Sequence, residues 1–189
     1  AANWKMHKTP AETIAFIEAL KKLLPQNNFV EIIIAPPFTS LESAAKALKG
    51  TPLKLAAQNT HWETSGAFTG EISALMLKAV GCAAVLIGHS ERRQIFGETD
   101  EQIHKKMMTA LSEGLNVIFC IGETFKEREE RKTHMVLEKQ LTAGFKELSK
   151  EKLSHVIIAY EPVWAIGTGK IATAGQAEEA QKYIRKVIW

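Results

Sequence analysis

The sequence has few of the features that mark membrane and secreted proteins. Its 189 residues include only two cysteines, Cys82 and Cys120, and both stand in apolar, strand-like surroundings. Two such cysteines predict buried thiols in a reducing compartment, and so a cytoplasmic protein. No apolar run approaches the roughly 20 residues that a membrane-spanning helix needs. The sequence therefore predicts no membrane span.

Charge of one sign and metal-ligand spacing are also scarce. The net charge is only +3, and the densest charged run, residues 126–132, mixes both signs. Such a run predicts a solvated helix face, so we expect no nucleic acid as a partner. The six histidines and two cysteines show none of the spacings typical of metal ligands, and we expect no metal site.

What the sequence does contain is a regular alternation of apolar strands and amphipathic helices. Capping boxes, in which a threonine precedes a Glu or Gln by three residues, predict helices that begin after Thr9, Thr99, Thr124 and Thr173, and we expect another after Thr39. Apolar runs predict strands at residues 30–35, 53–57, 83–87, 115–120 and 156–160, and a first strand cut short before Asn3. No linker or change of composition divides the chain, so residues 1–189 are expected to form a single domain.

Strands that are apolar throughout are typical of parallel sheets buried on both faces. Two architectures fit, a (β/α)8 barrel and an open doubly wound sheet. No glycine-rich fingerprint follows the first strand, which disfavours the dinucleotide-binding open sheet. Polar side chains follow the predicted strand ends, as at the active face of a barrel: Asn3, Lys5, Gln58, Asn59, His89, Glu91, Glu123 and Glu161. We therefore predict an α/β fold of the barrel type, with about six of the eight strand–helix units present.

Residues 159–170 have the composition of a lid beside a carboxylate. The last strand ends at Glu161, because Pro162 cannot donate to a sheet ladder. A bulky apolar segment follows and ends in Gly167 and Gly169, whose flexibility suits the ends of a moving loop. Desolvation by a closed lid would raise the basicity of Glu161 and suit it to act as a general base. The alternative is an ordinary strand-to-helix connection with a buried tryptophan.

His89 and Lys5 are two further candidates for chemistry. The residues after His89 can form a helical turn whose N-terminus points at the imidazole. That position disfavours an imidazolium, so a neutral His89 could donate a hydrogen bond to a developing oxyanion. Asn3 and Lys5 would share one face of an extended segment, where Lys5 could attract an anion. The alternative for His89 is a histidine that is hydrogen-bonded to the backbone. The alternative for Lys5, and the simpler one when Lys5 is considered alone, is an ordinary surface lysine.

Two other motifs do not hold. Ser90 is not a hydrolase nucleophile, because Arg92 stands where the elbow pattern needs a glycine. The run from Gly167 to Lys170 is not a phosphate-binding loop of the nucleotide-binding type. That pattern needs a glycine where Trp164 stands and a Ser or Thr where Ile171 stands. The loop from Gln58 to Gly70 is long and exposes Phe68 at its tip, which indicates a lid or an insertion into a partner subunit, unless the loop is a variable excursion.

Five motifs together resemble the triosephosphate isomerase family, in that family's order and over the whole chain: residues 1–6 (AANWKM), 66–71 (GAFTGE), 88–93 (GHSERR), 120–123 (CIGE) and 159–170 (AYEPVWAIGTGK). The resemblance implies a (β/α)8 barrel that interconverts dihydroxyacetone phosphate and D-glyceraldehyde 3-phosphate without a cofactor. It assigns Glu161 as the base and His89 as the neutral electrophile.

The resemblance also implies roles for other residues. Lys5 would stabilise the enediolate charge, and Asn3 would position Lys5 and the substrate. Gly167 would offer a backbone N–H to the phosphate, and Glu91 would lie beside Lys5 and His89. Thr69, in the loop from Gly66 to Gly70, would reach into a neighbouring subunit's site and so implies a homodimer.

The sequence departs from the family pattern at both ends. The start of the first strand is absent before Ala1, and two strand–helix units with phosphate-binding loops are absent after Trp189. We therefore expect the 189 residues alone to have little or no isomerase activity. Two other interpretations remain, a non-catalytic barrel module and a different phosphosugar isomerase or epimerase.

Overall fold

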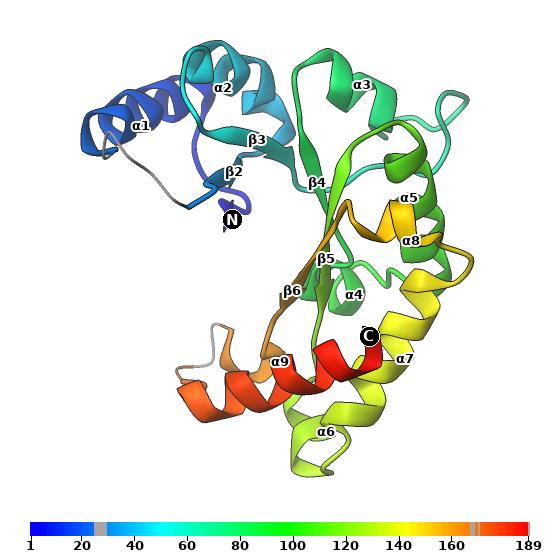
Figure 1. Ribbon diagram of the computed structural model, residues 1–189. Helices are drawn as coiled ribbons and strands as arrows, with labels where there is room; N and C mark the ends of the chain where they lie inside the picture. Colours follow the sequence, from blue (N-terminus) through cyan, green and yellow to red (C-terminus); the bar gives the residue numbers. More distant parts are fainter. Residues whose placement is uncertain (25–29, 167–168, 170, 189) are drawn as a thin grey trace. The chain divides into compact units, whose positions relative to one another are not determined.

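The computed structural model describes residues 1–24, 30–166, 169 and 171–188, in which strands alternate with helices (Figure 1). The strands are β1 (Ala2–Asn3), β2 (Ile33–Ala35), β3 (Lys54–Ala57), β4 (Ala84–Ile87), β5 (Asn116–Ile121) and β6 (Val156–Tyr160). The helices are α1 (Pro10–Leu23), α2 (Leu41–Leu48), α3 (Ala74–Ala79), α4 (Ser90–Gln94), α5 (Asp100–Ser112), α6 (Phe125–Glu129), α7 (Thr133–Phe145), α8 (Lys150–Leu153) and α9 (Ala174–Ile188). Two 3-10 turns, η1 (Phe38–Ser40) and η2 (Val163–Ala165), complete the described elements.

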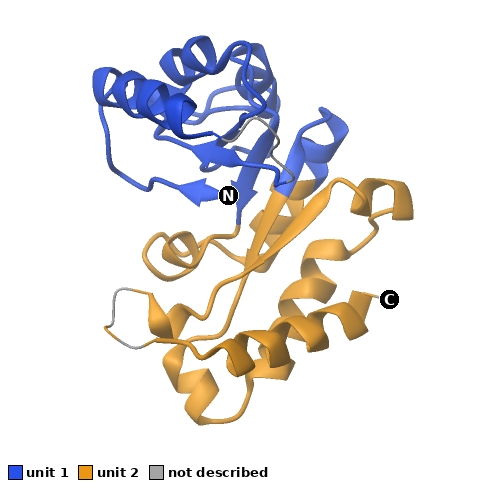
Figure 2. Ribbon diagram, turned by 60° about the vertical axis from the view of Figure 1, so that its left-hand side comes forward, with its two compact units in different colours: residues 1–87, 108–117 blue, residues 88–107, 118–189 orange. Residues whose placement is uncertain are grey.

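The chain divides into two compact units, which Figure 2 shows in two colours. Unit 1 comprises residues 1–87 and 108–117, and unit 2 comprises residues 88–107 and 118–189. The expected single domain over residues 1–189 stays a prediction. No helix in the described part of the chain is both long and apolar enough to cross a membrane.

Unit 1 is a parallel sheet covered by helices. Its strands pair in the order of the sequence, β1 with β2, β2 with β3 and β3 with β4, always in parallel. β2 and β4 are buried along their whole length, as strands enclosed on both faces should be. Helices α1 and α2 lie side by side (Figure 1), and α2 packs against β3. Thr9 opens α1 with the predicted capping box, in which the Thr9 side chain accepts the N–H of Glu12.

Unit 2 is built on β5 and β6. The backbone N–H of Glu161, directly after β6, donates to the carbonyl of Ile121 at 2.8 Å. The side chain of Phe119 in β5 is completely buried and packs so tightly against α7 that a Cβ on Gly144 would meet its ring at 2.6 Å. Helices α7 and α9 lie side by side (Figure 1), and the rings of His134 and Tyr183 stack between them at 4.0 Å.

Two helix predictions were wrong in detail. The capping box expected at Thr39 does not form. Pro37 precedes the 3-10 turn η1, which already contains Thr39, and Ser40 becomes the N-cap of α2 without a side-chain hydrogen bond. The helix expected after Thr124 is broken into α6 and α7. Arg131 adopts a left-handed φ of 55° there, and the N–H of Lys132 donates back to the carbonyl of Glu127, which ends α6.

β6 is less buried than expected for a strand enclosed on both faces. β5 is buried from Val117 to Ile121, but β6 is only partly buried, and Ile157 is 45% exposed. β6 stands last in the strand order of the described residues, so it has a strand beside it only at β5. Cys82 and Cys120 are buried and unpaired, as predicted. The alternation of parallel strands and helices agrees with the predicted fold class.

Candidate active site

His89 is placed by the sharp turn between β4 and α4. Gly88 has a φ of 77°, and His89 then serves as the N-cap of α4. The predicted helical turn is therefore present. The imidazole Nδ1 accepts the backbone N–H of Glu91 at 3.3 Å. A ring nitrogen that accepts a hydrogen bond carries no proton, so the proton of the neutral ring resides on Nε2.

Glu161 lies opposite that nitrogen. Its Oε1 is 3.1 Å from Nε2 of His89, and its Oε2 accepts the backbone N–H of Ser90 at 3.3 Å. The side chains of His89 and Glu161 are only 8% and 18% exposed. The structure thus brings together, within unit 2, the predicted base and the predicted electrophile.

The pKa of Glu161 differs from the expectation of a more basic carboxylate. Burial raises the pKa, but the hydrogen bond and electrostatic attraction of His89, together with hydrogen bonds from Ser90, outweigh burial, and the pKa lies below its ordinary value of 4.5. The carboxylate is therefore held in this arrangement as a stabilised anion. It becomes a stronger base only when it leaves these donors and stays out of water.

Glu91 lies on the other side of the imidazole. Its Oε2 is 3.5 Å from Nδ1 of His89, and its side chain is 39% exposed. A proton on Nδ1 would point at the backbone N–H of Glu91, which is another donor, so the hydrogen-bond geometry assigns the imidazole proton to Nε2, the nitrogen that faces Glu161.

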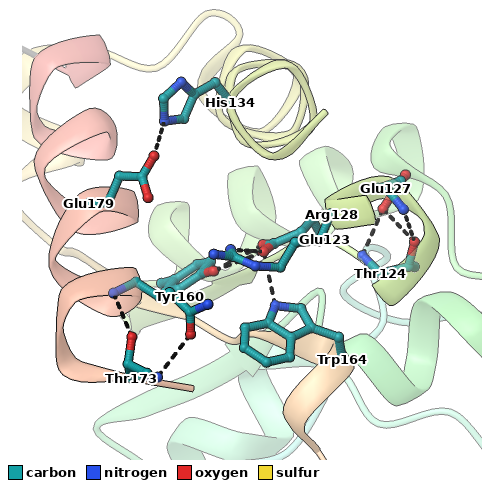
Figure 3. Close-up of polar contacts among 10 residues, drawn as sticks. Glu123, Thr124, Glu127, Arg128, His134, Tyr160, Trp164, Thr173 and Glu179 are labelled. Atoms are coloured by element: carbon teal, nitrogen blue, oxygen red, sulfur yellow. Dashed lines mark hydrogen bonds and ion pairs between the residues drawn. The ribbon is translucent and has the colours of Figure 1, made fainter. Parts of the chain in front are cut away.

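Glu123 forms a network that sequence reasoning missed. It follows β5, its side chain is completely buried, and it accepts hydrogen bonds from Arg128, Tyr160 and Trp164 at 2.9–3.1 Å. Figure 3 shows these three side chains converging on the carboxylate. The guanidinium of Arg128 also stacks 4.9 Å from the centre of the Trp164 ring. The only sequence signal was a carboxylate directly after an apolar strand, with an arginine one helical turn further on.

This network anchors the start of the predicted lid. Trp164 lies in η2, is 6% exposed, and follows Glu161 by three residues. Gly167, predicted to contact the substrate phosphate, lies outside the described residues. Gly169 has a φ of 76°, which suits a glycine at the far end of the lid.

Gly122 sets the position of Glu161 from the side of β5. A Cβ on Gly122 would lie 1.8 Å from the carbonyl oxygen of Glu161, so only glycine fits there. The side-chain amide of Gln140 in α7 holds Gly122 from the other side, accepting its N–H at 2.9 Å and donating to its carbonyl at 3.3 Å. Gly122 was part of a recognised motif, but no role had been predicted for it.

Asn3 and Lys5 lie in unit 1. The prediction that they share a face of an extended segment was wrong, because Lys5 has a left-handed φ of 51°. The side chain of Asn3 accepts the backbone N–H of Lys5 at 2.9 Å, and Gln58 donates to the carbonyl of Lys5 at 2.9 Å. Two side chains thus hold a backbone conformation that is strained for a lysine, a feature often found at functional sites.

The loop from Gln58 to Gly70 also belongs to unit 1. Thr69 is exposed at its tip, and Phe68 is 44% exposed. The ring of Phe68 packs 4.4 Å from that of His61, which stacks in turn on Trp62 at 4.2 Å. The tip is therefore supported from within the loop. Across the described residues, no group of three or more His, Cys, Asp or Glu side chains is placed to hold a metal ion.

Comparisons with known proteins cover the whole sequence. The model of the triosephosphate isomerase family matches residues 1–189. The triosephosphate isomerase of Geotalea uraniireducens is 54% identical over 188 residues, which cover 100% of this chain and 75% of the relative. Those of Pelobacter propionicus and Dictyoglomus turgidum are 51% and 53% identical, with 100% of this chain and 75% and 76% of the relatives covered.

Proposed function

The chain belongs to the triosephosphate isomerase family, and we propose that it interconverts dihydroxyacetone phosphate and D-glyceraldehyde 3-phosphate in glycolysis and gluconeogenesis. The observation that carries this proposal is the buried pair of His89 and Glu161, with 3.1 Å between Nε2 and Oε1. Two groups so close together can act on adjacent atoms of one small substrate.

In the proposed reaction, the carboxylate of Glu161 takes a proton from C1 of dihydroxyacetone phosphate. The electron pair of that C–H bond forms the C1–C2 double bond, and charge builds on the oxygen at C2. His89 donates its Nε2 hydrogen bond to this oxygen, as a neutral imidazole can. The oxygens then exchange a proton, and Glu161 returns its proton to C2. This sequence needs a base and an electrophile from the protein and consumes no cofactor.

Substrate binding has to break the contact between Glu161 and His89. The hydrogen bonds from His89 and Ser90 lower the pKa of Glu161, whereas burial raises it. Once the substrate takes the His89 donor for its own oxygen, burial remains and the pKa of Glu161 rises. The same displacement therefore frees the electrophile and strengthens the base.

The remaining residues act on the substrate's charge in this proposal. Lys5 stabilises the enediolate, and its strained backbone, held by the Asn3 side chain and Gln58, supports a functional role for its position. Asn3 positions Lys5 through this hydrogen bond and also positions the substrate. Gly167 donates its N–H to the phosphate, and Glu91 supports His89.

Dimerisation and location are also part of the proposal. The exposed tip of the loop from Gly66 to Gly70, with Phe68 and Thr69, supports a homodimer in which Thr69 reaches the partner's site. The expected mass in analytical ultracentrifugation is that of two chains, and Phe68→Asp should shift it toward one. The two buried, unpaired thiols agree with a cytoplasmic protein.

A coupled assay for triose phosphate turnover tests the activity. We would assay the 189-residue chain and a version extended to the length of the relatives that it matches, which we call the full-length protein. Turnover in the full-length protein, lost in Glu161→Gln and His89→Ala, is the expected result. A folded full-length protein without turnover would overturn the proposal and favour a non-catalytic barrel module.

A further inference from the structure

One arginine in unit 2, Arg93, donates hydrogen bonds to the backbone segments that position the side chains of His89 and Glu161. Its Nε donates to the carbonyl of Gly88 at 2.7 Å, its Nη1 to Oδ1 of Asp100 at 2.6 Å, and its Nη2 to the carbonyl of Cys120 at 3.4 Å. The Arg93 side chain is 15% exposed. A single planar guanidinium therefore spans the residue after β4, the C-terminal part of β5 and the first turn of α5.

The contact with Gly88 bears on His89 directly. The Gly88 carbonyl and the His89 N–H belong to the same planar peptide unit. A hydrogen bond to the carbonyl oxygen therefore fixes the orientation of the backbone at His89. Packing here is close. A Cβ on Gly88 would lie 3.0 Å from Nη2 of Arg93 and 3.1 Å from the Cys120 carbonyl. With φ at 77°, Gly88 leaves room for the guanidinium that orients the next residue.

The contact with Cys120 bears on Glu161. Cys120 precedes Ile121, whose carbonyl accepts the Glu161 N–H at 2.8 Å. The guanidinium thus holds the strand that anchors the base, one residue before the anchoring point. Asp100 pairs with the guanidinium and keeps it in this orientation. The three contacts use three different nitrogens of the fork, a geometry that a lysine ammonium cannot reproduce.

We propose that Arg93 is a positioning residue for the isomerase reaction: through the Gly88 and Cys120 carbonyls it holds the backbone of His89 and the strand beside Glu161, so that the imidazole keeps its orientation toward the substrate oxygen. The proposal rests on the proposed function. Arg93 does not touch the substrate in this account, and its effect passes through His89. Removing it should lower kcat, because misplacement of a catalytic group by about 1 Å can cost about 100-fold, while KM changes little.

A double-mutant cycle in the full-length protein tests this route. Arg93→Ala should lower kcat about 10–100-fold when His89 is present. In a His89→Gln background, the same substitution should lower kcat by less than about threefold, because the group that Arg93 positions is already gone. An equal fold-loss in both backgrounds would show that Arg93 acts on the fold in general, and would overturn the proposal.

Matched controls separate geometry from charge and from surface effects. Arg93→Lys keeps the charge but loses the fork, so it should lose most of the activity that Arg93→Ala loses; wild-type kcat in Arg93→Lys would contradict the proposal. Arg131→Lys and Arg131→Ala alter an exposed arginine on the turn between α6 and α7 and should leave kcat unchanged. Should Arg93→Ala fail to fold, Arg93→Lys takes its place in the cycle.

A measurement independent of turnover distinguishes failure of this inference from failure of the proposed function. In ¹⁵N spectra of the full-length protein, His89 should give one imidazole state, with Nδ1 accepting and Nε2 protonated. Arg93→Lys should shift or broaden these two signals, and Arg131→Lys should not. Unchanged His89 signals in Arg93→Lys would overturn the positioning role even if the enzyme is active. Absent turnover with the expected shifts would instead count against the proposed function alone.

Discussion

Nε2 of His89 lies 3.1 Å from Oε1 of Glu161, and this contact joins the two groups that the proposed reaction has to separate. This hydrogen bond helps to lower the pKa of Glu161 against the effect of burial, and it uses the Nε2–H that would otherwise be free to donate to a substrate. In the proposed mechanism this pair is the inactive resting state, and a substrate oxygen that replaces Oε1 at the imidazole converts it into a base and a hydrogen-bond donor at once.

Glu161→Gln should change the acid sensitivity of the fold. The folded-state pKa of Glu161 is below 4.5, so its ionised carboxylate stabilises the fold above pH 4.5, and this contribution is lost as the pH falls through the folded-state pKa. The difference in free energy of unfolding between the wild type and Glu161→Gln should therefore shrink as the pH falls below 4.5. Urea unfolding at several pH values measures it. A difference that stays constant down to low pH would contradict the assigned hydrogen bonds.

Glu123→Ala should destabilise the protein by about 3–5 kcal/mol, because it leaves the partly buried guanidinium of Arg128 without its carboxylate partner and the buried Trp164 N–H without an acceptor. Glu130→Ala is the matched control, since its solvent-exposed ion pair with Lys132 should contribute little to stability. Denaturant unfolding followed by circular dichroism gives both values. Equal costs for the two substitutions would refute a structural role for the Glu123 network.

Gly122→Ala should impair both stability and turnover. The added methyl would lie 1.8 Å from the Glu161 carbonyl and must push the start of the lid away from β5. We expect kcat to fall at least about tenfold, because Glu161 moves with its backbone. Gly175→Ala is the control, since no atom lies within 4 Å of its added Cβ, and it should be neutral or stabilise by about 0.4–1 kcal/mol. Full activity in Gly122→Ala would contradict the close approach.

Both thiols should be unreactive in the folded protein. Burial raises the pKa of Cys82 to about 12. Burial, with the nearby Glu161 carboxylate, also raises the pKa of Cys120 well above its ordinary value. Thiolates are therefore scarce at pH 8, and a chromogenic disulfide reagent should titrate both cysteines only in urea. Rapid labelling of either cysteine in the native protein would show that its pocket opens.

Local sequence signals predicted the helix starts correctly where hydrogen bonds form between residues close together in the sequence. The boxes at Thr9 and Thr124 form because Glu12 and Glu127 stand three residues on. The box at Thr39 failed because a neighbouring proline set the turn first. The break at Arg131 could not be seen, because a non-glycine residue adopts the left-handed conformation that ends α6.

The candidate site was predictable as a set of residues but not as an electrostatic arrangement. His89 and Glu161 could be found from motifs at strand ends. The lowered pKa of Glu161 depends on a hydrogen bond across 72 positions of sequence, which no local pattern encodes. The roles of Glu123 and Arg93 depend likewise on partners that only folding brings within reach.

The most direct test of the account is turnover of dihydroxyacetone phosphate in D₂O by the full-length protein and its Glu161→Gln variant, followed by proton NMR. We predict that the wild type forms glyceraldehyde 3-phosphate with deuterium at C2, because the proton held by Glu161 exchanges with solvent. Glu161→Gln should lose turnover and deuterium incorporation together, by about 100-fold or more. Turnover within tenfold of the wild type in Glu161→Gln would show that another group moves the proton and would contradict the central claim.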